Sequence, residues 1–344
     1  MAYMKIGILN GGGDCAGLNA VTRAVVKRAE SYGWEVFGIR YGWEGLLQSD
    51  IVKLSFAEVE KLIGVGGTIL KSSRTNPSKH PNGFQIVMEN FRKLGLEALI
   101  CVGGDDTLGV AFQLFKRGLP IVGVPKTMDN DLSSTDYTFG FDSAVNEAMH
   151  AIDNLRTTAE SHDRVFVVEI MGREAGWVAA YAGIASGANL VLVPEEPFDL
   201  DGVIAFVKNR RDRGEKATVI VVSEGASLKK ASAKASNGSV DEFGHPRLGG
   251  IGQLIGEEIE KMTKFDTRVS VLGHMIRGGS PTAFDRMLST QFGLAAVELI
   301  KEGKFGMMTS LRGIKIATVS LEEAVSKQRL LDPEILETLR MISY

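Results

Sequence analysis

The chain reads Leu99-Ile100-Cys101-Val102-Gly103-Gly104-Asp105-Asp106-Thr107 near the end of its first third. An apolar run followed by glycines and aspartates is typical of a buried parallel strand that opens into a polar loop. A second such run, at 121–124, leads into Pro125-Lys126-Thr127-Met128-Asp129-Asn130-Asp131. Open α/β sheets bind ligands beyond the carboxyl ends of their strands, so we expect both acidic loops to meet in one site.

The two loops contain the groups that phosphoryl transfer requires. Glycines admit a phosphate close to backbone N–H groups. One carboxylate can hold Mg²⁺, and another can accept the proton of an attacking hydroxyl. The pattern therefore predicts phosphoryl transfer.

Strand-like and helix-like segments alternate along almost the whole chain, which favours a mainly parallel sheet covered by helices. A strand, a glycine-rich loop and a helix occur around residues 11–17 and again around 171–176. We predict an α/β fold with two similar doubly wound lobes, whose mainly parallel sheets face a central cleft. Strands are expected at 5–10, 35–39, 99–102, 121–124, 165–170, 190–193, 218–222 and 269–272, and helices at 19–30, 57–63, 84–94, 108–117, 144–157, 177–186, 203–213, 248–262 and 285–301. The polar segment 226–246 predicts an exposed, mobile loop.

Composition narrows the class of protein. A length of 344 residues favours two lobes, and 44% hydrophobic with 24% charged residues is ordinary for a globular protein. The net charge of −3 offers no basic field for nucleic acid or an anionic membrane, and no apolar run is long enough to cross a bilayer. The N-terminus lacks the apolar core of a signal peptide, and two cysteines make no disulfide framework. We expect a cytoplasmic protein.

Further segments share one resemblance with the two acidic loops. They are Gly11-Gly12-Gly13-Asp14-Cys15-Ala16-Gly17-Leu18-Asn19-Ala20, Ser72-Ser73-Arg74, Arg164, Met171-Gly172-Arg173 and residues 268–279. In this order the chain resembles the 6-phosphofructokinase family from about residue 5 to residue 290. The resemblance implies reversible Mg²⁺-dependent phosphorylation of the 1-hydroxyl of fructose 6-phosphate, giving fructose 1,6-bisphosphate in glycolysis or gluconeogenesis. It also implies that the chain crosses between lobes repeatedly: a phosphate-donor lobe of 1–140 plus about 276–326, and a sugar-phosphate lobe of 141–275 plus about 327–344.

The resemblance assigns one group of residues to the phosphate donor. Asp105 would be the Mg²⁺ ligand, the alternative being an aspartate that caps the following helix. Arg74 would stabilise charge on the transferring phosphoryl group, the alternative being a solvated surface arginine. The donor itself would be bound by Gly12, Gly13, Gly104 and Thr107, although the first glycine loop alone could be a structural turn.

The choice of donor depends on Asp106 and Lys126. ATP-using members of the family typically have glycine at the first position and often at the second, whereas pyrophosphate-using members have Asp and Lys. A carboxylate at 106 would occupy the space of the α-phosphate of ATP and repel it by about 1–4 kcal/mol at 4 Å. The ammonium of Lys126 can hold pyrophosphate. A salt bridge between the two would instead say nothing about the donor, and an ATP-dependent enzyme remains the alternative.

A second group of residues is assigned by resemblance to the sugar phosphate. Asp129 would be the general base, with Thr127 and Asp131 beside it, although three polar residues after a strand could form a mere turn. Arg173 would contact the transferring phosphoryl group, and Glu224 the sugar hydroxyls. The cleft lining and the phosphate pocket would be completed by Met171, Gly172, Arg164, Arg268, His274 and Arg277.

The family resemblance also bears on assembly and regulation. In the family the positions of Arg164 and Arg268 reach a neighbouring active site, which implies a homodimer or homotetramer. Family members that are activated by nucleotides bind them through basic residues and an acid. Here Asn189 stands at the acid's position, so we expect weak or absent activation. A non-catalytic, two-lobed sugar-binding protein is the more remote alternative.

Overall fold

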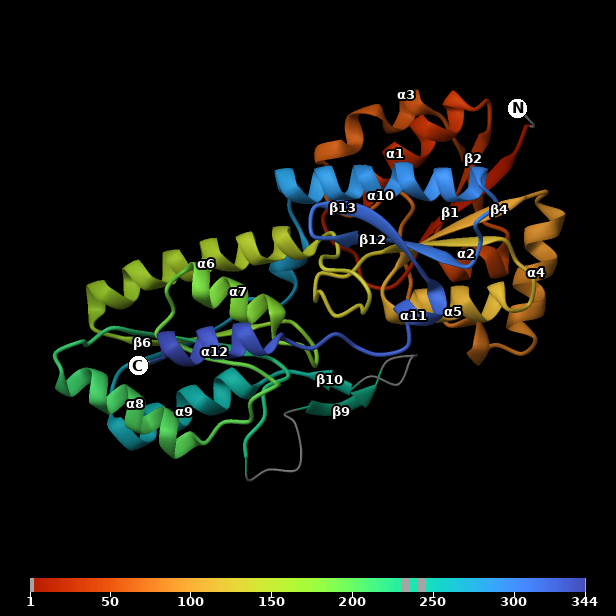
Figure 1. The fold of residues 1–344 in the computed structure, drawn as a ribbon. Coiled ribbons are helices and arrows are strands. Elements are labelled where there is room, and N and C mark those ends of the chain that lie inside the picture. The colour runs from red at the N-terminus through yellow and green to blue at the C-terminus, as the bar shows by residue number, and fades with distance from the viewer. Residues whose placement is uncertain (1–2, 230–235, 241–245, 344) are drawn as a thin grey trace.

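The computed structural model describes residues 3–229, 236–240 and 246–343, and two separate sheets organise it (Figure 1). One sheet has seven strands and the other has four. Each is covered by helices on both faces, and most neighbouring strands run parallel. We call the halves built on these sheets the large lobe and the small lobe.

The large lobe contains a sheet with the strand order β13-β12-β5-β4-β1-β2-β3. Its two edge strands run antiparallel to their neighbours, and the inner strands are parallel. The strands are β1 (Lys5–Asn10), β2 (Glu35–Ile39), β3 (Ile51–Leu54), β4 (Ala98–Gly103), β5 (Ile121–Pro125), β12 (Met307–Arg312) and β13 (Lys315–Ser320).

Side-chain alternation along β1 explains how both faces of this sheet are buried. Ile8 belongs to the core shared with α1 (Leu18–Ser31) and α10 (Ala283–Lys301). The next residue, Leu9, belongs to the opposite core, with α4 (Gly83–Lys93) and α5 (Asp105–Phe115). Successive side chains of a strand point to opposite faces, so a strand buried on both faces needs an unbroken apolar run.

The small lobe has a parallel sheet in the order β11-β6-β8-β7. Its strands are β6 (Val165–Ile170), β7 (Leu190–Leu192), β8 (Thr218–Ser223) and β11 (Thr267–Val271). Helices cover both faces, with cores that again divide alternate residues of β6. The covering helices are α6 (Phe141–His162), α7 (Trp177–Ala185), α8 (Leu200–Asp212) and α9 (Ile251–Thr263).

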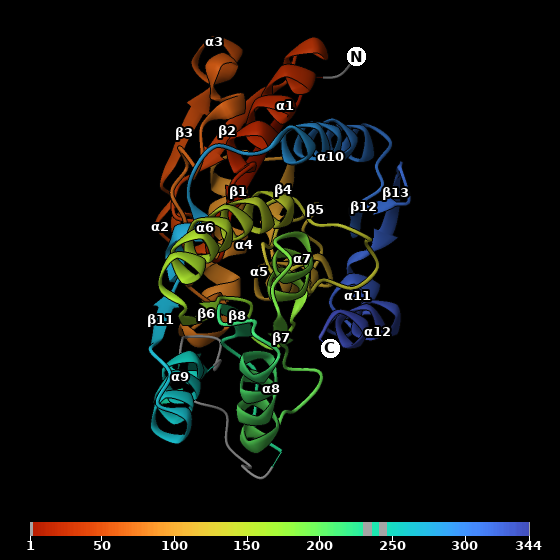
Figure 2. The ribbon, with the colours of Figure 1, turned by 90° about the vertical axis from the view of Figure 1, so that its left-hand side faces the viewer.

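Helix α6 joins the two lobes. It packs against α10 of the large lobe and against β6 of the small lobe, and both views show it between them (Figure 2). The chain crosses three times: through the loop 126–140 into α6, through η3 (Gly273–Arg277) into α10, and from α11 (Leu321–Ala324) into α12 (Pro333–Ile342).

Several elements differ from the expectations. The sequence did not indicate the edge strands β3 and β13, α2 (Trp43–Gln48), α11, α12, β12 or η2 (Pro77–Lys79). Edge strands alternate weakly, and helices of four to six residues are too short for a 3.6-residue period. The helix expected at 57–63 is a short α3 (Phe56–Val59) continued by the 3₁₀ turn η1 (Glu60–Gly64), and the one expected at 248–262 begins at Ile251, after two glycines with positive φ.

The loop prediction for 226–246 was wrong for part of that segment. There β9 (Ser236–Val240) pairs antiparallel with β10 (Pro246–Leu248). Residues 230–235 and 241–245 lie outside the described part of the chain. Within the described ranges, no helix is both long enough and apolar enough to cross a membrane.

Candidate active site

The loops that follow β1, β4 and β5 meet at one edge of the large sheet. The Gly11 N–H donates to the Val102 carbonyl (2.9 Å), and the Lys126 N–H donates to the Gly103 carbonyl (2.9 Å). Each bond ties the first residues of one loop to the end of a neighbouring strand. The meeting of the two acidic loops, expected from the strand pattern, is therefore confirmed.

A small pocket lies where these loops face the small lobe. Its volume is about 40 Å³ of space open to the centre of a water molecule, and four cationic and four acidic side chains line it. Arg173 comes from the small lobe, so the pocket lies between the lobes. Its lining is Gly12, Gly13, Arg74, Gly104, Asp105, Asp106, Thr107, Lys126, Thr127, Met128, Asp129, Asp131, Arg173 and Arg277. All except Met128 were predicted to belong to the site.

The glycine loop after β1 favours glycine at one position and packs closely against Arg277 at the next. Gly12 has φ = 79°, a left-handed conformation that favours glycine. A Cβ on Gly13 would lie 2.7 Å from Nη1 of Arg277, which also donates to the Asp14 carbonyl (3.0 Å). The guanidinium predicted for the sugar phosphate thus packs against the donor loop, and its Nε lies 3.2 Å from Sδ of Met171.

Lys126 is only 4% exposed, and its ammonium donates to the Gly13 carbonyl. Burial lowers the pKa of this ammonium, with a further lowering by Arg277 that Cys15 and Asp129 oppose. The side chain is therefore a desolvated cation held against the glycine loop.

The two aspartates after β4 lie in the first turn of α5. The N-cap residue of this helix is Gly104, and no side-chain cap is formed, so Asp105 does not fill the capping role considered above. Carboxylates in a first helical turn are favoured by the partial positive charge of that end. Asp106 Oδ2 lies 4.0 Å from Nη1 of Arg173, an ion pair between the lobes.

The loop after β5 orients its two aspartates through the residues between and beside them. Asn130 takes a left-handed conformation (φ = 53°), and its Oδ1 accepts from the Thr138 N–H (3.0 Å). The Asp129 N–H donates to Thr127 Oγ1 (3.1 Å). Among the described residues, the buried Asp129 Oδ1 has no hydrogen-bond partner. The sequence analysis missed Asn130 and Thr138 as orienting residues; an asparagine between two aspartates was the only signal.

Charge is concentrated around Asp131 and Arg173. Burial, together with the charges of Asp129 and Asp105, raises the pKa of Asp131 to about 7, and Arg173 opposes this rise. Burial alone would lower the pKa of the Arg173 guanidinium, but the four aspartates of the pocket outweigh it and raise that pKa. Arg173 is thus a permanent cation among four acids, of which Asp129 and Asp131 are buried.

The backbone around Arg173 is itself unusual. Arg173 has φ = 52°, a strained conformation for a non-glycine residue. The N–H groups of Gly172 and Arg173 donate to Glu224 Oε1 at 3.3 and 3.1 Å. Burial raises the pKa of Glu224, an effect that these two amides oppose. Glu224 therefore holds the loop that carries Arg173.

Six predicted residues do not line this pocket. Met171, Gly172 and Glu224 contact Arg277 or hold the Arg173 loop beside it, whereas Arg164, Arg268 and His274 lie elsewhere. Arg164 and Arg268 both pair with Asp266, the latter at 2.7 Å. They lie at the amino-terminal ends of β6 and β11, whereas Arg173 follows the carboxyl end of β6. His274 is exposed in η3. A single chain therefore does not bring Arg164 and Arg268 to the site.

The sequence matches the phosphofructokinase family model over residues 5–300. The pyrophosphate–fructose 6-phosphate 1-phosphotransferase of Streptomyces coelicolor is 51% identical over 336 residues, covering 97% of this chain and 98% of that protein. The ATP-dependent 6-phosphofructokinase 3 of the same organism is 49% identical and covers 94% and 95%. Overall identity therefore does not separate the two donor classes.

Solved structures agree on the fold. The phosphofructokinase of Saccharomyces cerevisiae superposes with a TM-score of 0.80 at 29% identity, over 99% of this chain and 47% of that one. The pyrophosphate-dependent phosphofructokinase of Marinobacter aquaeolei gives a TM-score of 0.83 at 23% identity, over 98% and 91%. The two-lobed α/β architecture predicted from the sequence is thereby confirmed, and the chain belongs to the phosphofructokinase family.

Proposed function

We propose that this chain is a pyrophosphate-dependent 6-phosphofructokinase. In the reaction, the 1-hydroxyl oxygen of fructose 6-phosphate attacks one phosphorus of pyrophosphate. The bridging P–O bond breaks, inorganic phosphate leaves, and the hydroxyl proton passes to a base. The product is fructose 1,6-bisphosphate, and the same groups serve the reverse direction.

The observation that carries the choice of donor is the pair of charged side chains, Asp106 and Lys126, that line the pocket. Lys126 is desolvated, with only 4% of it exposed. A buried ammonium suits a compact inorganic anion. A carboxylate in the first turn of α5 opposes the extra phosphate and nucleoside that ATP would bring.

The remaining pocket residues support definite roles. Asp129, with one unpartnered buried oxygen, suits the base that accepts the hydroxyl proton. Arg74 and Arg173 suit stabilisation of charge on the equatorial oxygens of the transferring group. Thr127 and Asp131 would orient the sugar hydroxyl, and Glu224 would act both on the Arg173 loop and on sugar hydroxyls.

The residues present fit Mg²⁺. This ion prefers one or two carboxylates plus phosphate oxygens and water, and Asp105 offers one carboxylate beside the glycine loop. The described residues contain no cluster of three or more protein ligands, so the substrate would have to complete the coordination. When bound, the ion would neutralise phosphate charge that the evenly balanced side chains of the pocket leave uncompensated.

The position of Arg164 and Arg268 supports an oligomer. Both lie at the end of the small sheet remote from the pocket of their own chain, where they could bind the 6-phosphate in a neighbouring site. His274 and Arg277 would complete that phosphate pocket. The proposed donor lobe is 1–140 with about 276–326, and the proposed sugar-phosphate lobe is 141–275 with about 327–344.

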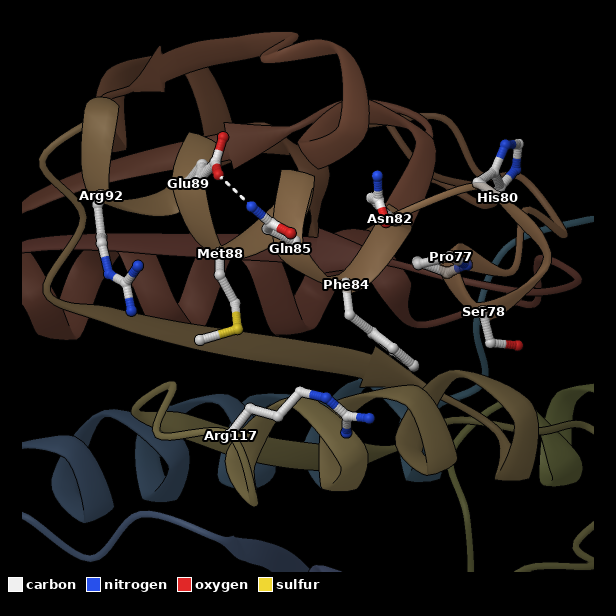
Figure 3. A pocket seen from close by; sticks show the side chains of 11 residues that line it. Pro77, Ser78, His80, Asn82, Phe84, Gln85, Met88, Glu89, Arg92 and Arg117 are labelled. Carbon is white, nitrogen blue, oxygen red and sulfur yellow. Dashed lines mark hydrogen bonds between the residues drawn. The ribbon is translucent and has the colours of Figure 1, made fainter.

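The second candidate is an ATP-dependent enzyme, favoured by a wider surface pocket that begins three residues after Arg74. Its volume is about 530 Å³, and α4 and the end of α5 form its walls. Figure 3 shows Phe84 and Met88 pointing across it toward Arg117, whose guanidinium lies 4.4 Å from the Phe84 ring. A nucleoside could lie here if its phosphates could pass Asp106.

A donor assay on the purified protein decides between the two. Fructose 6-phosphate and Mg²⁺ are supplied with either pyrophosphate or ATP, and fructose 1,6-bisphosphate is measured. We expect turnover with pyrophosphate and at least 100-fold lower kcat/KM with ATP. Robust turnover with ATP and none with pyrophosphate would refute the proposal.

A further inference from the structure

A segment near the C-terminus connects both lobes beside the pocket. We call residues 326–332, between α11 and α12, the strap. In Figure 1 it is the blue chain that runs from α11 in the large lobe to α12 in the small lobe.

On one side, the strap pairs with the loop that carries the proposed base. The Arg329 N–H donates to the Asp131 carbonyl at 2.8 Å, and Gln328 forms an antiparallel bridge with Leu132. Gln328 Nε2 donates to Asp131 Oδ2 at 3.3 Å. Gln328 is exposed overall, yet its amide reaches a carboxylate that is only 4% exposed.

On the other side, the strap holds the helix that follows the Arg173 loop. The Arg329 guanidinium lies 4.2 Å from the Trp177 ring, and Trp177 Nε1 donates to the Arg329 carbonyl at 3.2 Å. The Leu331 N–H donates to Glu195 Oε1, which also accepts from the Gly176 N–H. The strap thus contacts the loop of Asp131 directly and is connected to the Arg173 loop through Trp177 and Glu195.

We infer that Gln328 is a positioning residue, whose amide donor fixes the Asp131 carboxylate in the pocket while the strap holds the two loops in register. The inference rests on the proposed phosphofructokinase reaction. Asp131 lies among like charges, and carboxylates that repel one another need fixed donors to keep one orientation. A neutral amide supplies such a donor without adding a further cation, which could bind phosphate in competition with the other cations of the pocket.

The test compares variants that separate chemistry from size. Gln328→Glu keeps the shape but replaces the donor with an acceptor facing Asp131; Gln328→Ala removes the donor; Leu330→Ala is the control, because Leu330 is 50% exposed in the same strap. We expect kcat to fall at least 10-fold in Gln328→Glu and 3- to 5-fold in Gln328→Ala. The KM for fructose 6-phosphate should stay within 2-fold, and the control should match the wild type. If Gln328 only filled space, the kcat of Gln328→Glu would stay near the wild-type value, and that result would overturn the inference.

Hydrogen exchange on the ligand-free protein gives a readout that does not require turnover. In Gln328→Glu we expect at least 10-fold faster exchange at the amide of Arg329, and no change in Leu330→Ala. Unchanged exchange at Arg329 would overturn the inference even if the wild-type protein turned over neither donor. Absence of turnover by the wild type would count against the proposed function alone, so the two failures are distinguishable.

Discussion

Replacing Asp106 by glycine should relax the exclusion of ATP. Its carboxylate lies 4.0 Å from Arg173 in a pocket where both side chains are mostly buried, at 20% and 27% exposure. A like charge at about 4 Å costs about 1 kcal/mol in water and about 4 kcal/mol at an effective dielectric constant of 20. Because about 1.4 kcal/mol is tenfold, we expect kcat/KM for ATP to rise by about 5-fold to several hundred-fold in Asp106→Gly.

A second variant separates charge from size. Asp106→Asn removes the charge but keeps the volume, so its kcat/KM for ATP should rise less than that of Asp106→Gly. Asp14→Asn is the matched control, because Asp14 is an exposed acid of the glycine loop that does not line the pocket. Glycine in the first turn of α5 should also lower the free energy of unfolding by up to about 1 kcal/mol, which a Tm measurement monitors.

The assay is steady-state kinetics with each donor at saturating fructose 6-phosphate. Unchanged ATP kinetics in both Asp106 variants would refute the charge and steric reasoning. An equal gain in Asp14→Asn would show that general charge, and not the position of Asp106, controls discrimination.

Three further variants test other residues of the fold. Asp129→Ser should lower kcat about 10²- to 10⁴-fold, since it removes the proposed base, and unchanged turnover would contradict the assignment. Lys126→Met, which keeps length but removes the ammonium, should lower kcat/KM for pyrophosphate about 100-fold without lowering Tm, whereas a loss of Tm alone would indicate a structural role. Asp285 is fully buried, accepts bonds from the N–H (2.8 Å) and Oγ (2.6 Å) of Ser143, and has its pKa raised by burial to about 6. Folding therefore favours the protonated form of Asp285. As the pH falls from 7.5 to 5, the free energy of unfolding of the wild type should rise by about 1.5 kcal/mol relative to that of Asp285→Asn. Urea titrations in which both proteins show the same pH dependence would contradict this.

The central strands could be predicted because burial on both faces requires an apolar run that is visible in the sequence. Strands β1, β4 and β5 have helices on both faces, so nearly every position in them is buried and each contains an apolar run. The edge strand β13 has no fully buried residue, so it lacks the continuous apolar run of a central strand. Its place in the sheet is set by its pairing with β12, in which Ser320 lies opposite Met307, and this pairing exists only in the tertiary structure.

The site was predictable where its residues follow those strands directly. Asp105, Asp106 and Asp129 lie within a few residues of a strand end, so parallel topology alone brings them together. Arg173 required the family resemblance, because nothing in its local sequence places it opposite Asp106. Gln328 lies almost 200 residues from Asp131 along the sequence, in a short strap without periodicity. No sequence pattern predicts such a contact.

The ion pair between Asp106 and Arg173 connects donor choice with the position of the two lobes. Asp106 belongs to the large lobe and Arg173 to the small lobe, and Arg173 is presented by a strained backbone that Glu224 holds. Removing Asp106 therefore does two things: it opens space for a larger donor, and it releases the guanidinium proposed to contact the transferring phosphoryl group. The first effect should act on ATP alone, whereas the second should act on both donors. A change in kcat with pyrophosphate that accompanies the gain with ATP would thus measure the coupling of Asp106 to Arg173, separately from the space that its side chain occupies.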